Sequence, residues 1–144
     1  MTTVRQIIKG KGNAVWTISP VATVLDALQM LADKNVGALV VLEGDQVAGI
    51  FSERDYARRG ILKGRRAAET RVSEIMTSKV LFVTPSQTVD ECMELMTEKH
   101  IRHLPVMEGE RLIGIVSIGD VVKEIISEQQ FTIRSLENYI TGAK

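Results

Sequence analysis

Hydrophobic and polar positions repeat along this chain, and the repeat predicts its elements. Residues 15–61 and 80–126 align without a gap, because each position of the first segment corresponds to the position 65 residues later. Matched positions include Pro20 and Pro85, Thr23 and Thr88, Val24 and Val89, Lys34 and Lys99, Gly44 and Gly109, Gly49 and Gly114, Ser52 and Ser117, and Asp55 and Asp120. A gapless series of matches across every predicted element indicates two copies of one structural unit.

The first half of each copy predicts a strand followed by a helix. A short strand, residues 14–18 or 80–83, ends where a proline stops the hydrogen-bonded ladder. A Thr-x-x-acid capping box at Thr23 and at Thr88 then begins a helix. The apolar positions that follow recur at i, i+3, i+4 and i+7, which is typical of a helix with one buried face.

The second half of each copy predicts a hairpin and another helix. Two apolar runs joined by a glycine-containing turn, within 38–51 and 104–116, indicate the hairpins. Pro105 predicts that one of these strands pairs on one side only, since proline has no N–H to donate. The second helices begin at Ser52 and Ser117.

A unit of fewer than about 50 residues buries too little surface to be stable alone. We therefore predict an α/β (α+β) fold in which two β-α-β-β-α repeats pack sheet to sheet with pseudo-twofold symmetry and helices outside. The expected domains are residues 8–65 and 72–130, each with a short preceding helix, at 4–8 and 72–76. Residues 131–144 form a C-terminal arm that docks on this chain or on a second one.

Composition and charge narrow the class of protein. Eighteen basic and eighteen acidic side chains cancel, which argues against wholesale binding of a phosphate backbone. No apolar run approaches the roughly 18 residues that cross a bilayer. A single cysteine, Cys92, cannot form an internal disulfide. These features together predict a cytoplasmic protein with no membrane segment.

The pattern Gly-h-h-Ser-x-x-Asp, where h is apolar, occurs at residues 49–55 and 114–120. One interpretation is structural: serine at the N-cap and aspartate three positions later stabilise a helix start. The other is functional, because a hydroxyl and free N–H groups attract anions and the carboxylate accepts both hydroxyls of a ribose. In that interpretation the glycine lets a flat ring approach the strand. Spacing alone favours the structural interpretation slightly.

The duplicated motifs resemble the CBS motif, and the tandem resembles a Bateman module, over about residues 7–128. The resemblance implies a stand-alone CBS pair with two equivalent clefts that bind AMP, ADP, ATP, NAD(H) or S-adenosylmethionine. It also implies that pairs dimerise into a flat disc. We therefore expect an adenine-nucleotide sensor that forms a homodimer and regulates an effector protein, with AMP or another adenine nucleotide as ligand and NAD(H) possible.

The resemblance also implies the binding residues. The expected ribose contacts are Asp55, Asp120, Ser52 and Ser117; the adenine contacts are Ile50, Ile115, Ser19, Val24, Thr84 and Val89; the phosphate region comprises Gly37, Ala38, Arg102, His103, Arg54 and Gly119. Only the second copy carries a cation, Arg102, at the start of its middle strand, so unequal affinities at the two clefts are expected.

No catalytic or metal-binding set is predicted, because two histidines supply neither a triad nor enough convergent ligands. Two alternatives stay open. One is a scaffold for proteins or nucleic acid that uses the basic linker between the copies. We otherwise interpret this linker, which includes Arg58 and Arg59, as a solvated connector or as a contact to a ligand's phosphates. The other is a nucleotide-using enzyme, for which only His103 is available as a general acid or base.

Overall fold

The computed structural model describes residues 2–12 and 15–141, and its elements follow the repeat. The first part comprises α1 (Val4–Lys11), β1 (Thr17–Ile18), α2 (Val24–Lys34), β2 (Ala38–Glu43), β3 (Gln46–Ser52) and α3 (Glu53–Asp55). The second comprises α4 (Val72–Ile75), α5 (Val89–Lys99), β4 (His103–Glu108), β5 (Arg111–Ser117) and α6 (Ile118–Thr141). This mixed α/β architecture of two repeats confirms the predicted fold class.

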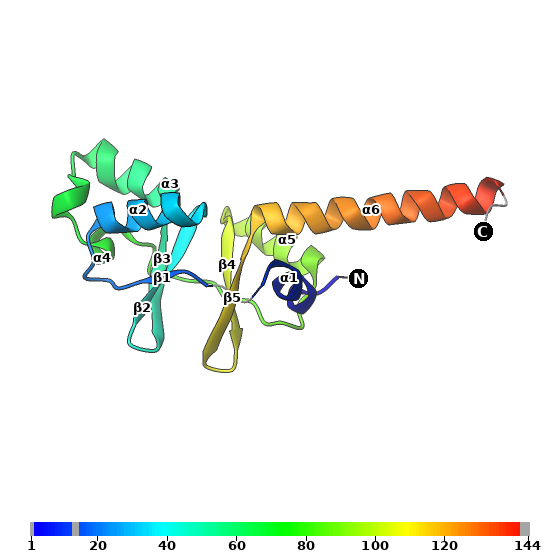
Figure 1. The fold of residues 1–144 in the computed structure, drawn as a ribbon, viewed down its shortest axis with the longest axis horizontal. Coiled ribbons are helices and arrows are strands. Elements are labelled where there is room, and N and C mark those ends of the chain that lie inside the picture. The colour runs from blue at the N-terminus through cyan, green and yellow to red at the C-terminus, as the bar shows by residue number, and fades with distance from the viewer. Residues whose placement is uncertain (1, 13–14, 142–144) are drawn as a thin grey trace.

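Two small sheets stand side by side, with helices on their far sides (Figure 1). One has the order β1-β2-β3, with β1 parallel to β2, and the other pairs β4 with β5. In β2, Leu39 and Val41 belong to the core beneath the helices, whereas the alternate residues Ala38 and Val40 are buried outside that core. Burial on both faces of β2 is the pattern expected when a second layer covers the sheet.

Each repeat has its own core, and each core contains the short helix that precedes the other repeat. The first core includes Val72 and Ile75 of α4, and the second includes Val4, Ile7 and Ile8 of α1. The prediction that each copy owns the helix before it was therefore wrong. The exchange ties the repeats together, because neither core is complete without chain from the other side.

The strand glycines make room for these exchanged helices. A Cβ on Gly49 would lie 2.8 Å from the Met76 sulfur and 2.7 Å from the carbonyl oxygen of Thr77. A Cβ on Gly114 would lie 2.8 Å from Cδ1 of Ile8. Each glycine is thus required by the close approach of the protein's own chain. The interpretation that these glycines let the ring of a ligand approach the strand was wrong.

The first strand of the second repeat is reduced to one bridge. Of the predicted strand 80–83, only Val83 pairs with β4. In the first repeat the N–H of Val40 donates to the carbonyl of Trp16 at 3.3 Å. Pro105 occupies the matched position in β4 and has no N–H to donate. Residues 80–82 therefore do not pair with the sheet. The other predicted strand, 14–18, is observed as β1, and residue 14 lies outside the described residues.

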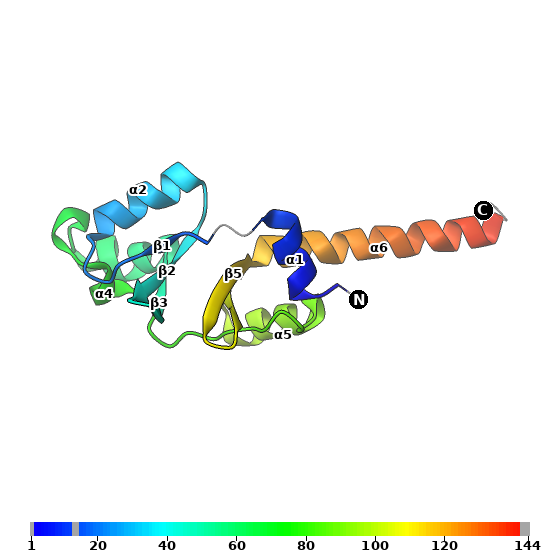
Figure 2. The ribbon, with the colours of Figure 1, turned by 60° about the horizontal axis from the view of Figure 1, so that its bottom comes forward.

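The second helices of the two repeats differ. In the first, α3 is followed by a π-helical turn (Tyr56–Gly60) and a 3₁₀ turn (Ile61–Lys63). In the second, α6 continues for 24 residues. It crosses the predicted boundary between residues 130 and 131, where the arm was expected to begin, as one continuous helix (Figure 2). Residues 127–141 are almost all exposed. The described part of the arm does not dock on this chain.

Candidate functional site

Both Ser-x-x-Asp motifs cap a helix start. The N–H of Ser52 donates to Oδ2 of Asp55 at 3.0 Å, and the N–H of Asp55 donates to the Ser52 hydroxyl at 3.2 Å. Ser117 and Asp120 repeat the arrangement at 2.9 Å and 3.1 Å. The structural interpretation of the motif is therefore confirmed. At Asp55 the Ser52 hydroxyl also donates to Oδ2 at 3.0 Å and the Thr77 hydroxyl donates to Oδ1 at 3.0 Å, so about one of the four lone-pair sites of this carboxylate stays available.

Asp55 lies in a cavity of about 540 Å³ that both repeats line. Volumes between about 300 and 1,000 Å³ are typical of sites for small molecules and cofactors. The lining residues are Gly37, Ile50, Ser52, Glu53, Arg54, Asp55, Arg58, Arg59, Thr77, Lys79, Val80, Leu81, His100, Ile101, Arg102 and His103. The cavity thus combines the helix start of the first repeat with the opening segments of the second.

Positive charge dominates the cavity. Five of its lining side chains are basic and two are carboxylates. Arg54 extends across to the second repeat, where its Nη1 donates to the carbonyl of His100 at 3.5 Å. Arg58 and Arg59 of the basic linker are exposed and line the cavity as well, in the place that the alternative of a phosphate contact requires. A concentration of guanidinium groups of this kind suits phosphate or carboxylate ligands.

Apolar side chains from both repeats also line the cavity. Ile50 lies on β3, and Val80, Leu81 and Ile101 come from the second repeat. Val80 and Leu81 are available there because Pro105 limits the pairing of their segment, as described above. A local sheet irregularity therefore supplies part of the cavity wall.

Seven predicted site residues line this cavity: Gly37, Ile50, Ser52, Arg54, Asp55, Arg102 and His103. Val24 and Val89 do not, because they are fully buried in the two cores, and the structure gives them no access to a ligand there. Ser19 and Thr84 are exposed and make local turn contacts. Ala38 is buried in the sheet. Ile115, Ser117, Gly119 and Asp120 lie at the matched place in the second repeat.

Thr77 is a cavity residue that the sequence did not identify. Its hydroxyl donates to Oδ1 of Asp55 at 3.0 Å, and its backbone pairs with Ile50. The repeat gave no signal for it, because the matched residue is Gly12. Lys79 was missed because the prediction took adenine contacts from the far ends of the first strands.

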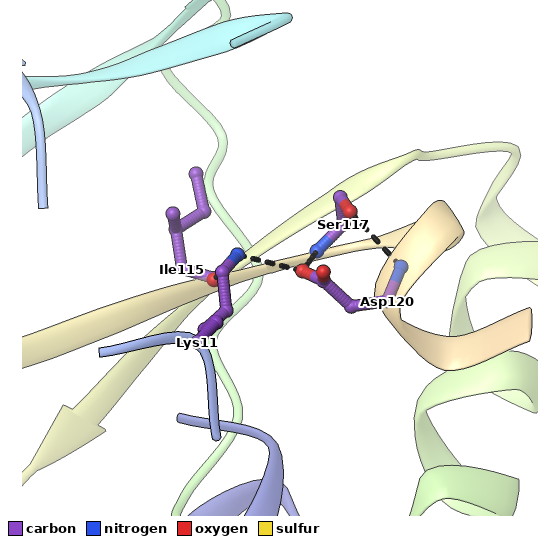
Figure 3. A network of polar contacts seen from close by, with 4 residues as sticks. All are labelled: Lys11, Ile115, Ser117 and Asp120. Atoms are coloured by element: carbon purple, nitrogen blue, oxygen red, sulfur yellow. Dashed lines mark hydrogen bonds and ion pairs between the residues drawn. The ribbon is translucent and has the colours of Figure 1, made fainter. Parts of the chain in front are cut away.

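At the matched place in the second repeat, Lys11 of α1 donates to Asp120, whereas Thr77 donates to Asp55 in the first. Figure 3 shows the contacts of Lys11. Nζ of Lys11 donates to Oδ2 of Asp120 at 2.7 Å and to the carbonyl of Ile115 at 3.0 Å. Burial by itself raises the pKa of Asp120, but hydrogen bonds from Lys11 and Ser117 and the lysine charge outweigh it, so the pKa lies below its ordinary value. The Asp120 carboxylate is therefore already neutralised by the chain.

His103 lines the cavity at Asp55 and lies within electrostatic reach of Asp120 as well. Its pKa is lowered chiefly by burial, next by the charge of Lys11 and also by Arg102, whereas Asp120 and Asp55 act in the opposite direction. A Cβ on Gly37 would lie 3.5 Å from Nε2 of this ring.

Two further observations concern the described residues. No helix among them is long and apolar enough to cross a membrane. Within the same ranges, no group of three or more His, Cys, Asp or Glu side chains is arranged to hold a metal ion.

Comparison with known proteins gives the family. The CBS domain profile matches residues 4–61 and 72–127. A CBS domain-containing protein of Arabidopsis thaliana, CBSX3, named as mitochondrial, is 42% identical over 98% of this chain and 73% of its own length. A solved structure from Burkholderia ambifaria, described as a putative signal-transduction protein with CBS domains, is 53% identical, with TM-score 0.86, covering 92% of this chain and 99% of that one.

A more distant structure has the same fold with ligands bound. The CBS domain pair of protein MJ0100 was solved with 5′-methylthioadenosine and S-adenosyl-L-methionine. It is 22% identical, with TM-score 0.79, and the match covers 89% of this chain and 98% of that one. At this identity the likeness concerns the fold. On the profile match and these relatives, the chain belongs to the CBS-domain family and contains two CBS domains in tandem.

Proposed function

We propose that this CBS pair is a regulatory module that binds an adenine nucleotide in the cavity at Asp55. The observation that carries the proposal is the composition of that cavity: a capped carboxylate, an apolar wall and a cluster of guanidinium groups in one space of about 540 Å³. A nucleoside phosphate needs those three features together. The adenosyl ligands of the related CBS pair support the same ligand class.

In this proposal, one ribose hydroxyl donates to the remaining acceptor site of Asp55, and the other replaces a hydroxyl that donates there in the free protein, that of Ser52 or Thr77. The adenine ring packs between Ile50 and Val80. The phosphates extend toward Arg102 and His103, where Arg54 and Lys79 add positive charge. Glu53 also lines the cavity, and its charge opposes ligands with long phosphate chains, so AMP is expected to bind more tightly than ATP.

The two clefts are expected to be unequal, with the first the tighter. Lys11 already satisfies Asp120 and the Ile115 carbonyl, which are the groups that a nucleoside would use in the second cleft. A ligand there must displace or accommodate an ammonium group. The proposal includes NAD(H) as a ligand because His103 lies within electrostatic reach of both Asp55 and Asp120, so that a dinucleotide would extend from one motif toward the other.

We infer that occupancy is passed on as a change in the arrangement of the two repeats, since both line the cavity. The partner that responds to this change is expected to be an effector protein. Neither catalysis nor nucleic-acid binding is part of the proposal. A cytoplasmic location and a homodimer stay predictions. The alternative of a scaffold without a small ligand is one outcome of the experiment below.

Thermal unfolding with AMP, ADP, ATP, NAD, NADH and S-adenosylmethionine tests the proposal. A ligand at 100 times its dissociation constant stabilises by about 2.7 kcal/mol, which raises the melting temperature of a domain of this size by several degrees. We expect at least one ligand to produce this shift, and Asp55→Ala to abolish it.

Asp26→Ala is the matched control. Asp26 holds the same third position of a helix, and its N–H donates to the Thr23 hydroxyl, but it lies outside the cavity. It removes a comparable helix-start carboxylate without touching the proposed site. If no ligand shifts the wild-type protein, nucleotide binding is refuted; if Asp26→Ala loses the shift as Asp55→Ala does, the assignment of Asp55 is refuted.

A further inference from the structure

The imidazole of His103 has no hydrogen-bonding partner in the part of the chain that the structure describes. His103 opens β4, where its backbone pairs with Ser117, and its side chain lines the cavity at Asp55. Neither ring nitrogen takes part in a hydrogen bond or an ion pair within residues 2–12 and 15–141. In the same ranges no buried side-chain nitrogen or oxygen lacks a hydrogen-bond partner, so both nitrogens of this ring are open to solvent. They are therefore free to contact a ligand in the cavity.

The charges around His103 favour the neutral ring in the free protein. Burial lowers the pKa of His103 most, and the charges of Lys11 and Arg102 lower it further. The carboxylates of Asp120 and Asp55 act in the opposite direction. The other charged or titratable side chains that line the cavity are Glu53 and Arg54 of α3, Arg58 and Arg59 of the π-helical turn, Lys79, and His100 at the end of α5. Cations outnumber carboxylates in this set, so a further positive charge on the ring is disfavoured.

A phosphate group beside the ring reverses this preference. It brings negative charge, and an opposite charge within about 4–6 Å changes the pKa of a group by about 1 to 3. Phosphate oxygens accept hydrogen bonds, and the protonated imidazole donates from both nitrogens, whereas the neutral ring donates from one. The proposed pose directs the phosphates toward Arg102 and His103, so the ring lies where its protonation strengthens binding.

We infer that a phosphate-bearing ligand takes up a proton at His103 when it binds in the cavity at Asp55, so that its affinity depends on pH. The inference rests on the proposed function and assigns a regulation to the same site. The protonated ring binds phosphate more tightly than the neutral ring, so the extra affinity is present at low pH. It is lost as the pH rises through the pKa that the ring has in the complex. Because a change of one in a pKa corresponds to tenfold in affinity, the dissociation constant should fall about 3- to 10-fold from about pH 8 to about pH 6.5.

Isothermal titration calorimetry of the wild-type chain with AMP measures this proton directly. Titrations at neutral pH are repeated in buffers that differ in ionisation enthalpy, and the dependence of the observed enthalpy on the buffer gives the number of protons taken up. The phosphate of AMP has a second pKa of about 6, so at neutral pH the ligand itself can only release a small fraction of a proton when it binds as the dianion. A net uptake therefore comes from the protein.

His103→Gln removes the titrating group and keeps a polar side chain. It should bind AMP with no net proton uptake, and its affinity should no longer rise toward pH 6.5. The matched control is His100→Asn, because His100 also lines the cavity and Asn35 holds the same place in the first repeat. Both residues have a left-handed backbone, with φ of 55° and 53°, which asparagine tolerates. This control should take up the proton as the wild type does.

NMR titration gives a second readout that does not depend on His103→Gln. The chain has two histidines, so the ring signals of His103 are the ones that His100→Asn retains. In the wild type these signals should titrate with a pKa below the ordinary 6.5 in the free protein, and with a higher pKa in the complex with AMP.

AMP binding without net proton uptake, or a ring pKa that AMP leaves unchanged, overturns the inference and leaves the nucleotide site standing. Equal uptake in His103→Gln, or loss of uptake in His100→Asn, assigns the proton to another group and overturns it as well. If no ligand raises the melting temperature of the wild type, the proposed function fails and the inference fails with it.

Discussion

Replacing Lys11 with methionine removes the ammonium group from the second cleft and keeps the length of the side chain. Nζ lies 2.7 Å from Oδ2 of Asp120 and 3.0 Å from the carbonyl of Ile115. The two side chains are 36% and 24% exposed, so solvent screens part of their attraction. An ion pair in this setting is worth about 1 kcal/mol, and the bond to the carbonyl about 1 kcal/mol more.

A nucleoside entering the second cleft of the wild type must overcome this interaction of about 2 kcal/mol, which corresponds to roughly 30-fold in affinity. In Lys11→Met we therefore expect the second-cleft dissociation constant to fall by about 10- to 30-fold, and the first cleft to stay unchanged. Isothermal titration calorimetry with AMP measures both sites. Lys9→Met, an exposed lysine on the same helix, is the control and should leave both sites unchanged.

A ligand-free readout accompanies the titration. Because the folded-state pKa of Asp120 lies below the ordinary 3.8, the carboxylate stabilises the fold above that pH, and the contribution is lost as the pH falls through the lower folded value. Lys11→Met should raise the pKa of Asp120, measured by NMR, and shrink this acid-sensitive stability. If the pKa rises but the second cleft binds no more tightly, or binds more weakly, the reasoning that Lys11 excludes ligand is refuted.

Two further predictions concern stability. His103 has a folded-state pKa below the ordinary 6.5, chiefly because it is buried, so the free energy of unfolding should decrease as the pH falls below about 6.5. Urea unfolding at several pH values measures this slope, and His103→Gln should flatten it. An unchanged slope in the variant would contradict the assignment to His103. Gly49→Ala should destabilise the protein by about 1–3 kcal/mol, because its Cβ would press on the Thr77 carbonyl and Met76. The control Gly10→Ala has nothing within 4 Å of the new Cβ and should not destabilise the protein. Equal melting temperatures for the two variants would contradict the packing argument.

Much of the fold could be predicted because its signals are local or repeated. The cap at Ser52 depends on Asp55 three residues later, and the turn at Gly44 depends on its positive φ of 65°, so both are legible in the sequence. The apolar period of α5 likewise predicts which side of the helix is buried. The sequence predicted that Pro105 limits strand pairing, since proline lacks an N–H. It did not predict that residues 79–81 would line the cavity as a result.

The site was predicted only where it coincides with a motif. Ser52 and Asp55 were identified because the motif contains them, whereas Thr77 and Lys79 carry no pattern that distinguishes them from other surface residues. Val24 and Val89 were misassigned because the sequence does not distinguish a valine that packs in a core from one that contacts a ligand. For Arg58 and Arg59 the sequence did not decide between a connector and a phosphate contact, because a basic run gives no direction for its side chains.

The sequence by itself determined the duplication and the helix starts, because each depends on residues within a few positions of one another or on a repeat of the chain. Only the tertiary structure decided which repeat receives which short helix, which segments enclose the cavity, and that Lys11 meets Asp120 across 109 positions. These contacts join residues far apart in the sequence and form only when both cores pack. No local sequence pattern predicts them, because the partner of a side chain depends on the arrangement of the whole chain.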